Sequence, residues 1–374
     1  MEVGVSERKS GDGDKAHSFL QSDFWSCFKG EHGWTSHRFD LTLDNSSQSS
    51  SLLVLVRRIP GGSCFGYVPH GPELDVHHND RAFLLAELSE KLRPFLPRRC
   101  FFIRYDPPWY NLETMPVEEG AVPSHYVDAV RPLVGRPLRR AIADVQPPDT
   151  VFVDLRPDED AILASMKPKW RYNVRLAVKK GVMVEKAGME AIHEFYGLYR
   201  ATSRRDRIVL HPESYYMRLF SLAQEHRMAG MEGTPDIRLW MAYHEGQSLA
   251  AIITLFLGTD AVYLYGASSN EKRNLMPAYA LQWEAMRAAK TAGCTRYDLF
   301  GIPPNDDPSH PMSGLYKFKT GFGGTIAHRA GSWDYPLQAP GYFFFRAAER
   351  ARTWWFKDFK KKMPMAKETG LTKG

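Results

Sequence analysis

The order of apolar and polar residues along the chain predicts both helices and strands. In its first part, apolar residues recur at helical spacing in 19–33 and 81–96, whereas the apolar runs at 51–59 and 101–109 are typical of strands. Residues 1–17 are polar and rich in Gly, Asp and Lys, so we expect a loose tail there. A first folded unit is therefore predicted to follow this tail.

A second set of elements follows the proline-rich stretch at 146–150, which is typical of a domain boundary. A strand is expected directly after it, at 150–155. Beyond this strand, helices are predicted at 161–180, 189–205, 214–228 and 278–293, and strands at 237–244, 248–257, 261–269 and 296–301. We therefore predict one domain over 18–149 and another over 150–330. Periodicity alone indicates a mixed α/β fold.

Composition agrees with two domains and places the charge at one end. The chain has 374 residues and a net charge of +6, and the segment 346–374 accounts for all of it with nine Lys/Arg and three Asp/Glu. The stretch 342–362 has aromatic residues with basic residues among them, which predicts an amphipathic helix. This helix could pack on the first domain with its basic face in solvent, contact the anionic inner membrane surface, or contact tRNA.

Metal and disulfide sites are not expected. No C-x-x-C pair occurs among the four cysteines, Cys27, Cys64, Cys100 and Cys294. The histidines His77, His78 and His310 lack partners at metal-ligand spacing. The N-terminus has no apolar signal-peptide core, and no apolar run reaches the ~18–20 residues of a membrane span. We predict a cytoplasmic protein without a resident cofactor.

Common cofactor motifs are also missing from the sequence. There is no Walker A, G-x-G-x-x-G, H-E-x-x-H or G-x-S-x-G motif. An acetyl-CoA-dependent acetyltransferase uses a glycine-rich loop at the start of a helix, where backbone N–H groups bind the pyrophosphate. The corresponding stretch here has no glycine between Ser268 and Met286, which counts against acetyl-CoA.

Two basic clusters are candidates for phosphate binding. The segment 167–181 carries Lys169, Arg171 and Arg175 without an acidic residue, and a helix would place the two arginines on one face. It would suit a polyphosphate or a tRNA backbone, although a solvated helix face has the same pattern. The second cluster contains Arg205 beside Asp206, and it could either clamp a phosphate or form a local structural pair.

The third cluster lies in the glycine-rich segment 299–324. Here Tyr316 and Phe318 alternate with Lys317 and Lys319, as they would on a strand. A lysine among aromatic residues beside a flexible backbone is suited to binding an anion or an oxyanion. Two surface lysines on a strand would give the same pattern.

Taken together, these segments resemble the FemABX family of peptidoglycan cross-bridge aminoacyltransferases. Seven stretches keep the family's order from residue 19 to residue 324; they are FLQSDFWSCFKGEHGW, FFIRYDPPW, K-x-x-R-Y-N-x-R-L-A-x-K-K-G-V, F-Y-x-L-Y-x-x-T-x-x-R-D, PAYALQWEAM, YDLFG and GLYKFKTGFGG. The resemblance implies two acetyltransferase-like domains of GNAT type, with segment 331–374 returning to complete the first. Some members insert a coiled-coil arm, but only 212–235 separates the R-D motif from the next strand, so no arm is predicted.

The resemblance also implies an activity. Such a protein transfers an amino acid from aminoacyl-tRNA to the side-chain amine of the third stem-peptide residue of a peptidoglycan precursor, UDP-linked or lipid-linked. Aminoacyl-tRNA would be a co-substrate, no cofactor would be needed, and the protein is expected to act as a monomer.

The family's functional positions fall on several residues of this chain. Lys319, with Phe318 beside it, would stabilise the oxyanion or a phosphate of the tRNA acceptor end. Lys29 and Arg205 match positions that hold the precursor's phosphates, although Lys29 also reads as a charge at a helix end. The further candidates for substrate binding are Arg104, Asp106, Tyr265 and Lys317, and those for the tRNA are Lys169, Arg171 and Arg175.

Two other classes of function remain open from sequence. One is an acyl-CoA-dependent N-acyltransferase acting on a small molecule or an exopolysaccharide. The other is a non-catalytic protein whose basic end binds RNA or a membrane surface. The sequence does not name the amino acid transferred or the acceptor diamino acid.

Overall fold

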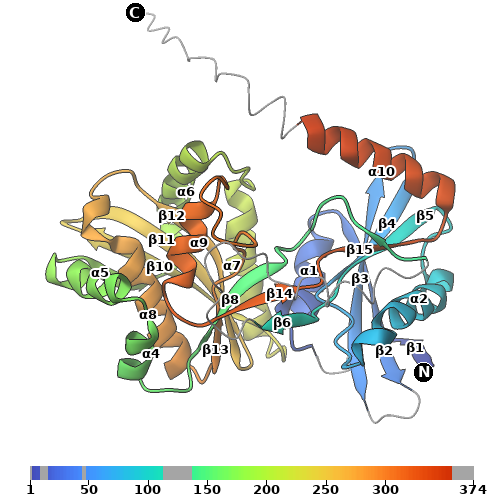
Figure 1. Cartoon of the computed structure of the whole chain (residues 1–374), viewed down its shortest axis with the longest axis horizontal. Coiled ribbons are helices and arrows are strands. Elements are labelled where there is room, and N and C mark those ends of the chain that lie inside the picture. The colour runs from blue at the N-terminus through green and yellow to red at the C-terminus, as the bar shows by residue number, and fades with distance from the viewer. Residues whose placement is uncertain (1, 9–15, 44–47, 113–136, 356–374) are drawn as a thin grey trace, which may run out of the picture.

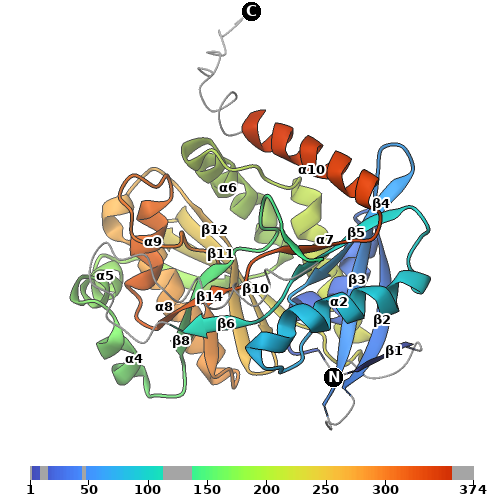
Figure 2. The same ribbon diagram turned by 45° about the vertical axis from the view of Figure 1, so that its right-hand side comes forward.

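The computed structural model describes residues 2–8, 16–43, 48–112 and 137–355, which form two mixed α/β units side by side (Figures 1 and 2). Each unit is a mixed sheet flanked by helices, which is the acetyltransferase-like architecture expected from the resemblance.

The first sheet has seven strands, and the chain returns to it near its end. Its order is β1 (Val3–Glu7), β2 (Trp34–Leu43), β3 (Ser49–Ile59), β4 (Ser63–Pro69), β5 (Cys100–Asp106), β15 (Trp333–Pro336) and β7 (Arg139–Arg140). β15 pairs antiparallel with β5. The associated helices are α1 (Asp23–Gly30), α2 (Arg81–Leu92) and α10 (Ala339–Trp354). The late segment β15–α10 thus adds to a sheet that the first hundred residues begin.

The N-terminus differs from the loose tail predicted for it. Val3–Glu7 is a strand that pairs antiparallel with β2, in a register that sets Val3 opposite Leu43. The side chain of Val3 is fully buried. A pattern of two valines in five residues is too short to distinguish a strand from a polar tail. The strand forms because its backbone pairs with the edge of β2.

The second sheet has eight strands. Its order is β6 (Tyr110–Leu112), β14 (Thr325–Arg329), β8 (Asp149–Asp154), β13 (Arg296–Asp298), β12 (Asp260–Ser268), β11 (Gln247–Leu257), β10 (Asp236–His244) and β9 (Met183–Ala187). Its helices are α4 (Glu159–Ser165), α5 (Pro168–Lys179), α6 (Ile192–Asp206), α7 (Glu213–Met228), α8 (Pro277–Thr291) and α9 (Ser313–Thr320).

One feature of this sheet positions the candidate site. β12 and β13 are parallel, but they pair only over Asp260–Val262 and Arg296–Asp298. After Asp298 the chain continues along β8, its partner on the other side, where Leu299 N–H donates to the carbonyl of Val151. β12 meanwhile continues to Ser268. The two strands therefore separate at one end, and side chains can enter between them.

Two secondary-structure expectations are corrected by the structure. The single helix expected over 161–180 is divided into α4 and α5, because Pro168 lacks a backbone N–H and begins a new helix at N1. The segment with alternating lysines and aromatics is the helix α9 and not a strand. The prediction that no arm is present is confirmed, since only the 16-residue α7 lies between α6 and β10.

A shared apolar core joins the two units. Side chains of α1 and β3 pack together with those of α6, α7 and β10–β12 in one buried cluster. At its centre the rings of Phe28 on α1 and Tyr215 on α7 lie 4.8 Å apart. On its surface Arg218 of α7 forms an ion pair with Glu31, which caps α1. The interface between the units is therefore continuous with their cores, which fixes α1 against the second sheet.

Candidate functional site

Lys319 occupies the opening between β12 and the chain that follows β13. Only 5% of the residue is exposed, and its Nζ donates to the carbonyl oxygens of Phe300 and Gly301, each at 3.0 Å. On the other side, Nζ lies 5.0 Å from the ring centre of Tyr263 on β12. An ammonium group has three N–H donors, so these two carbonyls leave a third hydrogen for another acceptor.

Asp298 at the end of β13 fixes the backbone that Lys319 contacts. Its Oδ1 accepts a hydrogen bond from the Phe300 N–H at 2.8 Å and another from the Thr150 hydroxyl. Phe300 has a left-handed backbone with φ of 57°. Non-glycine residues adopt this conformation only where neighbouring contacts hold it. The carboxylate thus holds the turn that presents two carbonyls to the lysine.

The position of Lys319 also changes its acidity. Burial lowers the pKa of Lys319 to about 7, and the negative charge of Asp298 opposes this shift. The ammonium form is held by carbonyl dipoles and not by a direct ion pair. A lysine of this kind can change its charge near neutral pH.

Phe318 anchors the helix that carries Lys319. Its carbonyl accepts a hydrogen bond from Trp170 Nε1 at 2.8 Å, and its ring lies 5.2 Å from that of Tyr279. Gly321 follows α9 directly, and a Cβ on it would lie 2.1 Å from Trp170. The close approach of Trp170 to the end of α9 therefore requires glycine at this position.

Lys29 lies at the junction of the two units, in an aromatic environment. Its Nζ lies 4.6 Å from the Trp25 ring and 5.5 Å from the Tyr215 ring, and it donates to the Tyr215 hydroxyl at 3.2 Å. Burial, with a smaller contribution from Arg57, lowers the pKa of Lys29 to about 8. The aromatic side chains hold the cation without neutralising it.

Tyr265 and Arg205 extend this group along the end of β12. Tyr265 is half-buried and shares a side-chain hydrogen bond with Tyr215, which connects it to Lys29. Arg205, at the end of α6, donates to the Ser268 carbonyl at 3.1 Å and to Asn270 Oδ1 at 3.0 Å. It also pairs with Asp206, so part of its guanidinium is already occupied.

The structure thus brings most of the leading candidates to one strand. Tyr263 of β12 faces Lys319, whereas Tyr265, two residues later, leads to Lys29, and Ser268 contacts Arg205. Lys319 therefore contacts β12 at Tyr263 and Arg205 contacts it at Ser268, whereas Lys29 is connected to β12 through Tyr215. Such an arrangement can bind several anionic groups of one or two substrates.

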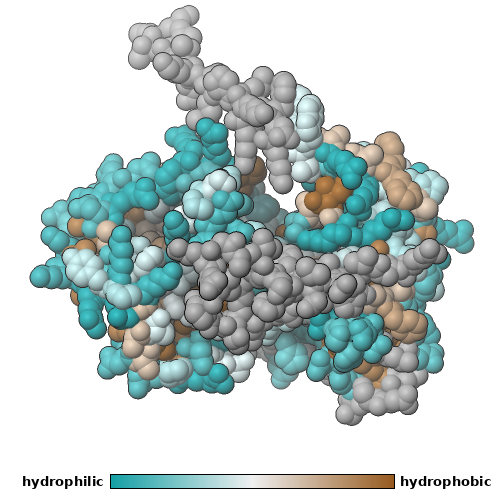
Figure 3. Space-filling model, in the orientation of Figure 1, coloured by the Kyte–Doolittle hydropathy of each residue, from teal (hydrophilic) through white to brown (hydrophobic). Residues whose placement is uncertain are grey.

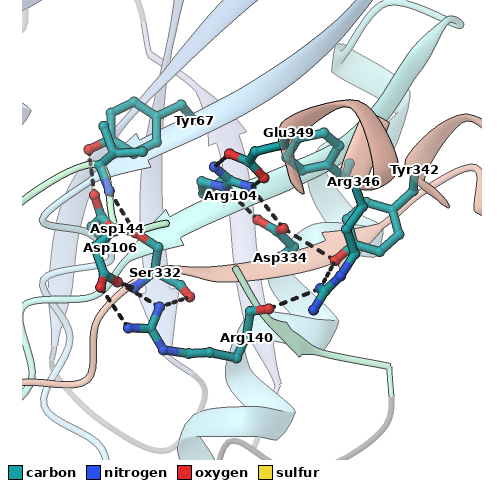
Figure 4. A network of polar contacts seen from close by, with 12 residues as sticks. Tyr67, Arg104, Asp106, Arg140, Asp144, Ser332, Asp334, Tyr342, Arg346 and Glu349 are labelled. Carbon is teal, nitrogen blue, oxygen red and sulfur yellow. Dashed lines mark hydrogen bonds and ion pairs between the residues drawn. The ribbon is translucent and has the colours of Figure 1, made fainter. Parts of the chain in front are cut away.

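Two candidates lie elsewhere, inside the polar network of the first unit (Figure 4). Arg104 forms buried ion pairs with Asp334 at 2.7 Å and with Glu349 at 2.8 Å. Asp106 accepts hydrogen bonds from the Tyr67 hydroxyl at 2.6 Å and from the Ser332 hydroxyl. Burial raises the pKa of Asp106, and its hydrogen bonds oppose that shift. These contacts occupy both side chains and give them structural roles.

The candidates for tRNA contact are divided by their surroundings. Lys169 and Arg175 are exposed on α5, and Lys317 is exposed on α9. Arg171 instead donates to the carbonyls of Ala164 and Met166, which end α4. Arg171 therefore joins α4 to α5. Of the basic residues expected to share a phosphate-binding face on α5, Lys169 and Arg175 remain exposed.

Three residues of the site were not singled out from sequence. Tyr215 connects Lys29 to Tyr265, Asp298 orders the turn at Phe300, and Trp170 holds α9. Asp298, the last residue of a buried strand, was the clearest available signal, because a carboxylate at a strand end often orders the following loop. Tyr215 has no such local signal, since its partners lie on other elements.

A cavity of about 980 Å³ lies at the opposite end of the second sheet. It is lined by Arg156 and Arg296, but Arg156 pairs with Asp154 and Arg296 with Asp260. Within the described ranges, no cluster of His, Cys, Asp or Glu could hold a metal ion. No helix in the same part of the chain is both long and apolar enough to span a membrane.

Comparison with known proteins gives a consistent result. The sequence model of the FemAB family matches residues 12–229 and 238–350. Lipid II:glycine glycyltransferase of Staphylococcus saprophyticus subsp. saprophyticus is 24% identical over 388 residues, covering 88% of this chain and 91% of the relative. The protein of the same name from Staphylococcus aureus strain USA300 is 23% identical, covering 86% and 89%. The crystal structure of FemX superposes with a TM-score of 0.73 at 20% identity, over 92% of this chain and 100% of FemX, which shows a shared fold.

Proposed function

The chain belongs to the FemAB family, and on this basis we propose that it transfers an amino acid from aminoacyl-tRNA to the side-chain amine of the third stem-peptide residue of a peptidoglycan precursor. The curated relatives are lipid II:glycine glycyltransferases, so the lipid-linked precursor is the first acceptor to test and the UDP-linked form the second. The observation that carries the proposal is the buried Lys319, whose third N–H is available beside two fixed carbonyls.

The reaction would be a direct acyl transfer. The neutral acceptor amine attacks the ester carbonyl of the aminoacyl-tRNA, and the C–N bond forms as the carbonyl oxygen becomes an oxyanion. The C–O bond to the ribose then breaks, and the proton lost by the amine goes to the leaving ribose oxygen, which becomes a hydroxyl. No covalent enzyme intermediate is required, which agrees with the missing nucleophile motifs.

Lys319 would stabilise the oxyanion or an adjacent tRNA phosphate in this scheme. A pre-positioned cation in a buried site lowers the barrier because it needs no reorganisation as charge develops. Lys29 and Arg205, on the other side of β12, would bind the phosphates that link the acceptor to its carrier. The exposed Lys169, Arg175 and Lys317 would contact the tRNA backbone.

The start of α8 counts against the alternative acyl-CoA reaction. Binding of a pyrophosphate there would need free backbone N–H groups and close approach to the helix end. Here Pro277 occupies the first position of α8 and has no N–H, and its neighbour Met276 has a left-handed backbone with a bulky side chain. The geometry therefore supports an aminoacyl donor over acyl-CoA.

The test offers charged tRNAs one at a time with lipid-linked or UDP-linked precursor, and measures the mass of the product. A mass increase of one amino-acid residue, dependent on tRNA, is expected for at least one pair. Acetyl-CoA is supplied in a parallel reaction without tRNA. Product formed only from acetyl-CoA would overturn the proposal.

A further inference from the structure

The outward side of α10 carries an exposed apolar stripe. Phe344, Trp354 and Trp355 are 76%, 59% and 47% exposed. Residues three and four apart lie on one face of a helix, and this spacing aligns the following side chains, here called the outer face: Phe344, Ala347, Ala348, Ala351, Trp354 and Trp355. Figure 3 shows apolar residues gathered over the position of α10.

The opposite side of α10 fixes the helix in this orientation (Figure 4). Glu349 pairs with Arg104 of β5 at 2.8 Å, and Arg346 donates to the Arg140 carbonyl at 2.9 Å. The ring of Phe345 also packs 4.9 Å from that of Phe102. Since these contacts attach α10 to the first sheet through its inner side, the helix cannot roll over to bury the outer face.

Basic residues border the outer face. Arg350 and Arg352 are exposed and lie on its two sides. The sequence continues beyond α10 with Lys357, Lys360, Lys361, Lys362, Lys367 and Lys373 against two acidic residues. A stripe of aromatic residues flanked by arginines matches the boundary of an anionic bilayer, where rings enter the acyl region and cations meet phosphates.

We propose that the outer face of α10 docks on an anionic membrane surface. Charge argues against a second copy of the chain, because two such basic faces would repel each other. RNA would use the arginines but would leave the apolar stripe in water. Figures 1 and 2 show α10 and α6, which carries Arg205, at the same upper edge of the molecule. A membrane along this edge would lie close to the helix that bears one of the phosphate-binding candidates. The docking proposal does not depend on the reaction proposed above.

The experiment is flotation of the full chain with vesicles of phosphatidylglycerol and phosphatidylcholine, compared with phosphatidylcholine alone. We expect binding to the anionic vesicles, and about tenfold weaker binding for the double variant Phe344→Ser, Trp354→Ser. The variant Arg350→Glu, Arg352→Glu should lose the preference for phosphatidylglycerol. Phe83→Ser, which removes a 56% exposed aromatic from α2 of the same unit, is the matched control and should bind normally.

Circular dichroism and thermal unfolding verify that each variant is folded. The proposal is overturned when the unmodified chain fails to float with anionic vesicles. It is equally overturned when the double variant Phe344→Ser, Trp354→Ser floats as well as the unmodified chain. It is also overturned when the same double variant abolishes tRNA binding or dimer formation while vesicle binding is unchanged. Because no turnover is measured, each of these results leaves the proposed acyl transfer untouched.

Discussion

The side-chain nitrogen of Lys319 lies 3.0 Å from the carbonyl oxygen of Phe300, so its hydrogen-bond partner is a backbone carbonyl and not a carboxylate. Asp298 acts one step away, through the Phe300 N–H. A carbonyl dipole holds the ammonium group without cancelling its charge, so the charge can still act on a substrate. This arrangement is the basis of the first two predictions.

Removal of the Lys319 amine should reduce the rate and leave the fold intact. We expect Lys319→Ala to lower kcat by about 10²–10³, as for the loss of an oxyanion donor, with a smaller effect on KM. Lys186→Ala is the control, since Lys186 is an exposed lysine of the edge strand β9. Single-turnover rates with saturating aminoacyl-tRNA measure the effect. A kcat for Lys319→Ala within twofold of the unmodified enzyme would contradict the assigned role.

The pH dependence of the rate should report the charge of Lys319. Its pKa of about 7 means that the ammonium form is present below pH 7 and is lost as pH rises above it. The kcat of the unmodified enzyme divided by that of Lys319→Ala should therefore fall as pH rises from 6 to 9. The acceptor amine titrates equally in both reactions, so its effect cancels in this ratio. Asp298 raises this pKa, so Asp298→Asn should move the fall to lower pH. A ratio that increases with pH would instead assign Lys319 as a base.

The fold was predictable from sequence where the apolar pattern is long. β10, β11 and β12 differ from their predicted bounds by no more than one residue at either end, because each is a long buried run. β2 was not predicted, since its polar residues face outward near the sheet edge and interrupt the pattern. α9 was mistaken for a strand because its lysines and aromatics alternate, although Lys319 points inward from a helix.

The candidate site was predictable only as a set of residues. The resemblance pointed to Lys29 and Lys319; Lys319 lies against Tyr263 of β12, and Lys29 is connected to Tyr265 of β12 through Tyr215. The hydrogen-bond partners that position them come from other segments: Tyr215 follows Lys29 by 186 positions, and Phe300 precedes Lys319 by 19. Local pattern carries no information about such pairs. The same holds for Arg104, whose buried partner Glu349 lies 245 positions away.

Loss of the Lys29 charge should weaken acceptor binding more than turnover. We expect Lys29→Met to raise KM for the precursor about tenfold or more, the usual effect of removing a charged hydrogen bond to phosphate. Because the pKa of Lys29 is about 8, the KM of the unmodified enzyme should also rise above pH 8 and that of Lys29→Met should not. Steady-state kinetics with UDP-linked precursor measure both effects. A KM for Lys29→Met that matches the unmodified enzyme would exclude Lys29 from the acceptor site.

The exposed basic residues of α5 should contribute to tRNA affinity. The double variant Lys169→Glu, Arg175→Glu should raise KM for aminoacyl-tRNA, and its binding should depend less steeply on salt because fewer phosphate contacts remain. The control variant Lys91→Glu, Arg98→Glu makes the same change in net charge on the exposed surface of the first unit. Filter binding at several salt concentrations measures the slope. Equal slopes for the two double variants would place the tRNA on another surface.

The ion pair between Glu349 and Arg104 should stabilise the attachment of α10. Both side chains are more than nine-tenths buried, and removing one member of a buried pair leaves the other charge poorly compensated. Since Asp334 still contacts Arg104, we expect Glu349→Ala to lower the free energy of unfolding by about 3 kcal/mol, the lower end of the usual range. Asp154→Ala, which breaks the exposed pair with Arg156, should have little effect and serves as the control. Urea unfolding measures both variants. If Glu349→Ala unfolds at the same urea concentration as the unmodified chain, the ion pair with Arg104 does not hold α10 on the first sheet. The fixed orientation of the outer face would then need another explanation.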